Sequence, residues 1–129
     1  MANPNIVSVA SIYGETNGWN LTNTVSTTLF TVSSGKLIKV NRIACANVDG
    51  SSAADLTVYI TTSVQTSAGG TVASGATDVY LAKTISIPAD ASLVVSDTPI
   101  YLREGDILKG GASAASDLDL LITYDVIAE

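Results

Sequence analysis

The chain has 129 residues, of which 47% are hydrophobic and 14% charged, and its net charge at pH 7 is −6. This composition excludes an intrinsically disordered protein, and the length fits one domain, residues 1–129, with a core of its own. The six Lys and Arg residues are scattered along an acidic chain, which argues against nucleic acid and anionic membrane as partners.

The N-terminal residues form a short polar segment. Residues 1–5 contain one proline and no basic stretch followed by an apolar one, so we expect no secretion signal and synthesis in a host cytoplasm. No run approaches the ~20 apolar residues of a membrane span. We interpret residues 1–5 as an N-terminal arm that reaches a neighbouring molecule, with contacts made by Ala2, Asn3, Pro4 and Asn5.

Residues 6–12 are predicted to form the first strand. A loop is expected at residues 13–18, because their glycines and asparagine suit turns. Residues 24–32 are rich in β-branched side chains, which predicts a second strand. The Ser33-Ser34-Gly35-Lys36 stretch is typical of a tight turn, so a hairpin is expected between this strand and the next.

Residues 37–48 are the longest predicted strand. The apolar phase slips by one residue after Val40 and resumes at Ile43. Such a slip requires a bulge or a change of face near Asn41 and Arg42.

Residues 55–64 and 117–127 show the clearest alternation of apolar and polar side chains, which is typical of a sheet buried on one side. In the first segment one face carries Leu56, Val58 and Ile60, and the other carries Asp55, Thr57, Tyr59 and Thr61. In the second segment the apolar face carries Leu118, Leu120, Ile122, Tyr124 and Val126, against Asp117, Asp119, Thr123 and Asp125.

Residues 65–77 form an uncharged stretch dominated by Ser, Thr, Ala and Gly. One interpretation is a long exposed loop that contacts a partner, since long loops on rigid scaffolds often bind. The contact residues would then be Ser67, Gly69, Gly70 and Val72. The other interpretation is an insertion without a role.

Further strands are predicted at residues 79–87, 92–96, 98–102 and 107–109, with a turn at residues 103–106 and a small, flexible segment at residues 110–116. The chain shows no helical periodicity and no internal repeat. Eight or nine short strands joined by turns predict an all-β fold, a single antiparallel β-sandwich or jelly-roll-like domain.

The residues that usually carry catalysis are mostly missing. Without histidine, neither a Ser-His-Asp nor a Cys-His arrangement can form within the chain. A glycosidase-like carboxylate pair or a calcium site would have to come from the acidic residues of turns and strand edges, namely Glu15, Glu104, Asp106, Asp117 and Asp119. Solvated carboxylates are the simpler interpretation, so we predict no catalytic residue, no metal and no cofactor.

Two single residues have a structural and a functional interpretation. Cys45 has no partner for a disulfide within the chain, and we interpret it as a small core residue rather than a nucleophile. Trp19 could stack against a sugar, but a lone tryptophan in a chain poor in aromatics more often anchors a loop onto the core.

Four stretches together resemble a family of small virion proteins of marine tailed bacteriophages, especially cyanophages. They are residues 1–7, residues 39–43 running on to Ala46-Asn47-Val48-Asp49-Gly50, residues 85–90 with Leu93-Val94-Val95, and residues 100–106. The resemblance covers nearly the whole chain except residues 65–77.

The resemblance implies a non-enzymatic β-sandwich protein of the phage particle. The favoured role is a capsid decoration or cement protein that binds the major capsid protein or other virion proteins as a homo-oligomer, expected to be a trimer. The alternatives are a tail, neck or fibre component, or a carbohydrate-binding adhesion module. A surface of few charges suits repeated weak contacts on a lattice, where avidity supplies affinity.

Overall fold

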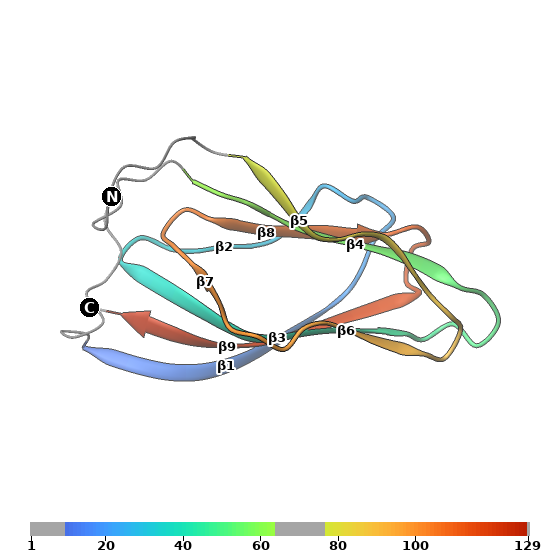
Figure 1. Cartoon of the computed structure of the whole chain (residues 1–129), viewed down its shortest axis with the longest axis horizontal. Coiled ribbons are helices and arrows are strands. Elements are labelled where there is room, and N and C mark those ends of the chain that lie inside the picture. The colour runs from blue at the N-terminus through green and yellow to red at the C-terminus, as the bar shows by residue number, and fades with distance from the viewer. Residues whose placement is uncertain (1–9, 64–76, 129) are drawn as a thin grey trace.

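The computed structural model describes residues 10–63 and 77–128, which form two antiparallel sheets stacked face to face (Figure 1). The strands of this part of the chain are β1 (Ser11–Asn20), β2 (Thr27–Thr31), β3 (Lys36–Asn47), β4 (Ala54–Thr61), β5 (Asp78–Ile87), β6 (Ser92–Ser96), β7 (Ile100–Leu102), β8 (Ile107–Ala112) and β9 (Leu118–Ala128). The predicted all-β sandwich is confirmed.

The strands are distributed between the two sheets in the order of a jelly roll. The first sheet runs β1-β9-β3-β6, with β7 also paired to β3, and the second runs β2-β8-β4-β5. If β6 and β7 are counted as one interrupted strand, the chain forms the eight-stranded double sheet of a jelly roll. This topology places β1 and β2 at the edges on one side of the sandwich and β6 and β5 at the edges on the other.

The core lies between the sheets and is built from the apolar phase of each strand. Leu56, Val58, Leu118, Leu120 and Ile122 are all at most 1% exposed, as the alternation predicts. The opposite face of β4 is less exposed than the pattern suggests. Thr57 and Tyr59 are also buried, because Thr57 accepts a hydrogen bond from the backbone N–H of Thr84 and Tyr59 stacks on Tyr80.

The predicted slip in the longest strand is confirmed. The pairing of β3 with β9 shifts register between Val40 and Arg42, where the apolar phase changes. The strands β4, β5, β6 and β7 and the turn at residues 103–106 also form where they are predicted, with end residues that differ by up to three positions.

The predicted loop at residues 13–18 is wrong. These residues lie inside β1, which pairs with β9 over ten consecutive positions, from Ser11 opposite Ala128 to Asn20 opposite Asp119. Gly14 and Gly18 do not turn the chain here. Cross-strand pairing to a long neighbour overrides local turn preference, because each pair adds ladder hydrogen bonds.

The predicted hairpin around Gly35 is also wrong, although the turn itself exists. The backbone N–H of Lys36 donates to the Ser33 carbonyl oxygen, and Gly35 has a φ of 74°. However, β2 lies in the second sheet and β3 in the first. The turn therefore carries the chain from one sheet to the other, and hydrophobic faces rather than the turn decide which strands pair.

The predicted flexible segment at residues 110–116 is wrong in its first half. Gly110 and Gly111 continue β8 and are buried. The segment between β1 and β2 crosses Gly111 so closely that a Cβ there would lie 2.4 Å from the carbonyl oxygen of Thr24, and a Cβ on Gly110 would lie 2.6 Å from the carbonyl oxygen of Thr57 on β4. Glycine within a strand often marks such a close backbone approach.

The predicted N-terminal arm, residues 6–9 of the first predicted strand, and residues 65–76 of the long loop lie outside the described residues. In the described ranges, no helix has the length and hydropathy that crossing a bilayer requires.

Candidate functional site

The predicted contact residues all lie outside the described part of the chain. They are Ala2, Asn3, Pro4, Asn5, Ser67, Gly69, Gly70 and Val72. Their roles remain predictions, and the candidate site is therefore built from the surface that the structure describes.

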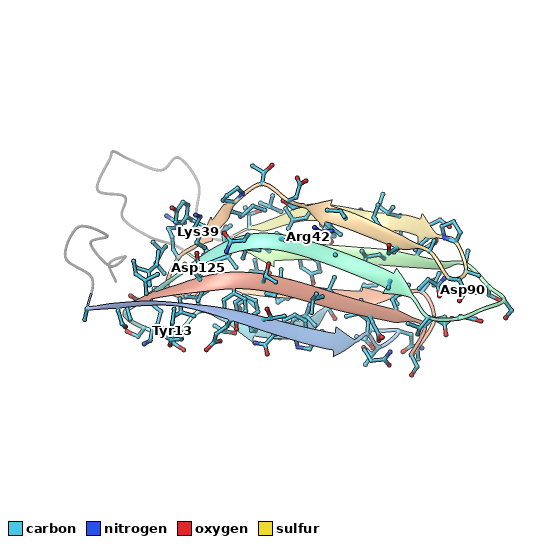
Figure 2. All side chains as sticks on the ribbon, turned by 90° about the horizontal axis from the view of Figure 1, so that it is seen from below. Tyr13, Lys39, Arg42, Asp90 and Asp125 are labelled. Atoms are coloured by element: carbon cyan, nitrogen blue, oxygen red, sulfur yellow. The ribbon has the colours of Figure 1, made fainter. Side chains whose placement is uncertain are left out.

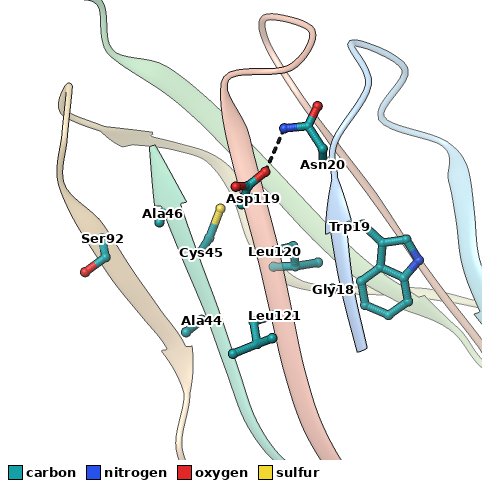
Figure 3. A pocket seen from close by; sticks show the side chains of 10 residues that line it. All are labelled: Gly18, Trp19, Asn20, Ala44, Cys45, Ala46, Ser92, Asp119, Leu120 and Leu121. Carbon is teal, nitrogen blue, oxygen red and sulfur yellow. Dashed lines mark hydrogen bonds between the residues drawn. The ribbon is translucent and has the colours of Figure 1, made fainter. Parts of the chain in front are cut away.

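A groove of about 420 Å³ runs across the outer face of the first sheet (Figure 3). Strands β1, β9, β3 and β6 contribute to its lining, which consists of Gly18, Trp19, Asn20, Ala44, Cys45, Ala46, Ser92, Asp119, Leu120 and Leu121. The groove exists because the two strands on either side of β9 carry glycine or alanine at outward positions, with Gly18 on β1 and Ala44 and Ala46 on β3. These short side chains leave a depression on both sides of the longer side chains of β9.

Leu121 is the main apolar side chain of this groove. It lies opposite Gly18 on one side and Ala44 on the other, and it is 45% exposed. Its neighbours in β9, Leu120 and Ile122, point into the core. The signal for this residue was present in the sequence, since Leu121 is the one apolar residue at an outward position between Asp119 and Thr123.

One end of the groove is polar. The Asn20 side-chain amide donates to an Asp119 carboxylate oxygen at 2.6 Å and to the Ser116 carbonyl oxygen at 3.2 Å (Figure 3). These groups satisfy one another, so the groove offers mainly apolar contact. Such a site suits an apolar side chain of a partner better than a substrate that needs several hydrogen bonds.

The same face exposes further apolar side chains beyond the groove. Ile12 on β1, Val94 on β6 and Tyr101 on β7 are 60%, 45% and 52% exposed. Charged side chains lie among them, with Lys39 opposite Asp125 in the register of β3 and β9, and both are on the face shown in Figure 2. We call this surface, which includes the groove, the outer face of the first sheet.

Trp19 is placed as an anchor and not as a sugar platform. Its indole stacks on the Phe30 ring of β2, with 6.2 Å between centroids and 7° between planes, and Phe30 stacks in turn on Tyr124. The indole therefore faces the second sheet. The predicted anchoring role is confirmed, except that the residue belongs to a strand and not to a loop.

The acidic residues considered for catalysis or calcium do not come together. The Glu104 carboxylate accepts hydrogen bonds from the Ser34 hydroxyl and the Gly35 N–H. It therefore lies at the end of the sandwich where β3 begins and Lys36 pairs with Ala128. Asp119 lies at the other end, where it pairs with Ala46. In the described residues, no group of three or more His, Cys, Asp or Glu side chains could hold a metal ion.

Glu15 takes part in a small network on β1 and β9. The Tyr124 hydroxyl donates to a Glu15 carboxylate oxygen at 2.8 Å and accepts from the Asn17 amide at 2.6 Å. Burial of Tyr124, followed by its hydrogen bond to Glu15 and the charge of that group, raises the pKa of the phenol. This network links β1 to β9. These hydrogen bonds join Glu15 to a phenol and not to a second carboxylate of a catalytic pair.

Cys45 is buried on the core side of β3, as predicted for a small core residue. Burial, with a smaller contribution from the negative charge of Asp119, raises the pKa of its thiol from 9.0 to about 11. We expect the native thiol to react with a disulfide reagent at pH 8 many times more slowly than the urea-unfolded thiol, measured by absorbance. Equal rates would contradict this placement.

The same shift predicts a pH dependence of stability. Because the pKa is raised in the folded state, this group stabilises the fold fully below pH 9 and loses that contribution as the pH rises towards 11. Cys45→Ala, which removes the titrating group, should show a smaller decline of unfolding free energy across this interval.

The second sheet carries an aromatic cluster on its exposed side. The rings of Tyr59 and Tyr80 stack with centroids 4.8 Å apart. Lys83 lies 5.1 Å from the Tyr80 centroid, and Lys109 lies 5.9 Å from that of Tyr59. The lysine amines contact the tyrosine rings, and the rings contact each other. We therefore interpret the cluster as a cover over the outer side of β4.

No protein-family model and no curated protein matches the chain. Among solved structures, a protein of Bacillus endospore appendages, described as disulfide-linked pili, is 13% identical with a TM-score of 0.44, covering 92% of this chain and 87% of that one. A protein from the structure of infectious bursal disease virus, Gt strain, is 12% identical with a TM-score of 0.39, covering 94% of this chain and 33% of that one. These are distant likenesses of fold alone.

Proposed function

We propose that this protein is a non-enzymatic structural component of a phage particle, and most specifically a capsid decoration or cement protein. The observation that supports the proposal is the outer face of the first sheet, where Leu121 and Val94, each 45% exposed, lie on either side of Ala44 at the apolar groove, and Ile12 and Tyr101 are exposed farther along the same face. Large exposed apolar side chains beside a groove are typical of protein–protein interaction sites.

The binding partner in this proposal is the major capsid protein or another virion protein, with no cofactor required. Many copies on a symmetric lattice bind through avidity, so each contact can be weak. The outer face of the first sheet suits this use because it combines apolar side chains with only a few charges. Its rigid, hydrogen-bonded backbone loses little conformational freedom on binding.

The test is co-sedimentation of the purified protein with capsids that lack it. Leu121→Asp places a charge in the groove without touching the core, and we expect at least about a tenfold loss of capsid binding, because a desolvated unpaired charge is costly at an interface. The matched control is Ile85→Asp on β5, which changes a 42% exposed residue of the second sheet. Unchanged binding by Leu121→Asp would contradict the assignment of this face.

The predicted N-terminal arm and long loop enter the same assay. Deletion of residues 2–5, or replacement of residues 66–76 by a short turn, should weaken capsid binding while leaving the fold intact. Full binding by both variants would show that neither segment contacts the particle.

Two other roles are distinguished by further measurements. Labelling of intact particles with an antibody would place a tail, neck or fibre component away from the head. A carbohydrate-binding module should bind on a glycan array, which we do not expect, because the Trp19 ring is engaged by Phe30. The resemblance implies a trimer, whereas the strand pairing proposed below gives a dimer, and the solution mass distinguishes the two.

A further inference from the structure

Strand β1 forms an edge of the first sheet that carries few of the devices by which proteins protect exposed edges. Short strands, bulges, prolines and lysines normally discourage further pairing. In the described part of the chain, β2 has five residues and a register shift, and β6 and β7 are short and separated by Pro99. β5 carries Lys83 and a register shift near Thr84, whose φ is 48°.

By contrast, β1 is ten residues long and pairs with β9 without a register shift. It contains no proline, lysine or arginine. In Figure 2 it lies at the outer margin of the first sheet, with β9 on one side only. Its one charged residue, Glu15, accepts a hydrogen bond from the Tyr124 hydroxyl. A long edge with so little protection is a template for another strand.

The hydrogen-bonding groups of this edge can be assigned from the ladder. The backbone N–H of Leu21 donates to the carbonyl oxygen of Leu118. These two residues are the next opposed pair after Asn20 and Asp119, so this bond shows which pairs of the β1–β9 ladder are hydrogen-bonded. Because bonded and non-bonded pairs alternate in antiparallel sheets, the odd-numbered residues of β1 bond to β9. The backbone groups of the even-numbered residues, Ile12, Gly14, Thr16, Gly18 and Asn20, therefore point away from the sheet.

The side chains of β1 are also incompletely covered. Tyr13 lies opposite Val126, whose side chain belongs to the core, and yet Tyr13 is 44% exposed. Ile12, on the other face of the strand, is 60% exposed. β1 thus exposes one large apolar side chain on each face, and within the described ranges its outward backbone groups have no strand partner.

We propose that β1 of one molecule pairs antiparallel with β1 of a second copy of this chain, joining the two first sheets into one continuous sheet. The twofold axis passes beside Thr16, so that Thr16 lies opposite its equivalent and Gly14 lies opposite Gly18 of the other copy. This register overlaps all five outward residues and forms about ten hydrogen bonds between the chains, two for each opposed pair.

Charge and shape favour this register. Shifting it by two residues towards the N-terminus would place Glu15 directly opposite its equivalent, and like charges directly opposite are destabilising. The opposite shift would leave only four outward residues overlapping, with Asn20 opposite Gly14 of the other copy. In the proposed register Glu15 lies opposite Asn17, and Tyr13 lies opposite Trp19. Ile12 of the second copy lies opposite Asn20, diagonally across from Gly18, where it can cover the apolar groove beside Leu121.

The test uses the central position of Thr16, whose side chain lies on an exposed face of β1. The wild-type protein at about 100 µM should have twice the 13.2 kDa mass of the chain by light scattering. Thr16→Lys and Thr16→Glu should each have the mass of one chain, because like charges meet at the axis. An equimolar mixture of the two variants should regain the double mass.

Thr28→Lys, at an exposed position of the neighbouring edge strand β2, is the matched control and should remain a dimer. Circular dichroism spectra and melting temperatures close to the wild type would show that the variants fold. A monomeric or trimeric wild type, or a dimer that persists in Thr16→Lys, would overturn the pairing. The inference rests on the proposed function, since pairing of copies would take place on the particle. The mass is measured without capsids, so a failure of the pairing would leave the capsid-binding test unaffected.

Discussion

Gly111→Ala is expected to lower the free energy of unfolding by about 3 kcal/mol. A Cβ at this position would lie 2.4 Å from the carbonyl oxygen of Thr24, 2.7 Å from its carbonyl carbon and 2.8 Å from the Cα of Val25. All three contacts are with backbone, so no side chain can rotate away. Either β8 or the segment that crosses it must move, and both are held by hydrogen bonds, such as that from Ala112 N–H to the Thr22 carbonyl oxygen.

Urea denaturation followed by circular dichroism measures this change. Gly50→Ala is the matched control, because its Cβ would meet only the Asp90 carboxylate, at 3.6 Å and 3.8 Å, and its φ lies outside the left-handed region. We expect this control to stay within about 0.5 kcal/mol of the wild type. Equal stability of the two variants would mean that the crossing segment does not pack against β8 as described.

Asp106→Ala is expected to lower the free energy of unfolding by roughly 3 kcal/mol. Asp106 is 3% exposed, and its carboxylate accepts hydrogen bonds from the Ser63 N–H at 2.8 Å, the Ser63 hydroxyl at 2.9 Å and the Arg103 N–H at 2.8 Å. Alanine would remove an acceptor shared by two backbone donors, that of Ser63 just after β4 and that of Arg103 just after β7. Buried backbone donors without partners are costly.

Asp106→Asn separates the hydrogen bonds from the charge. The asparagine keeps one acceptor oxygen and has nearly the same size. We therefore expect its free energy of unfolding, by the same urea titration, to lie between that of the wild type and that of Asp106→Ala. A carboxylate that served a partner or a metal instead of the fold would behave differently, since its replacement by alanine would leave the unfolding free energy unchanged.

Much of the fold could be predicted from side-chain periodicity. The alternation in β4 and β9 identifies the buried faces, because a strand places successive side chains on opposite sides. The slip after Val40 predicts the bulge that the structure places between Val40 and Arg42. These features depend on residues near each other in sequence, and that is why local patterns reveal them.

The candidate site was less predictable. Its groove combines outward positions of strands that are distant in sequence, with Gly18, Ala44 and Leu121 brought side by side by the register. None of them is unusual alone. Only Leu121 gave a signal in the sequence, because it is an apolar residue at an outward position of a strand with acidic neighbours. Its significance depends on the residues that lie beside it on the neighbouring strands.

By itself, the sequence determined the all-β class, the alternating core faces, the bulge in β3 and the burial of Cys45. The tertiary structure alone decided that residues 13–18 continue an edge strand, that the Gly35 turn joins two sheets, and that Gly111 lies beneath a crossing backbone. It also separated Glu104 from Asp119 at opposite ends of the sandwich. The reason is that periodicity acts between neighbours in sequence, whereas partner strand, sheet membership and backbone crossings depend on hydrogen bonds and packing between distant segments.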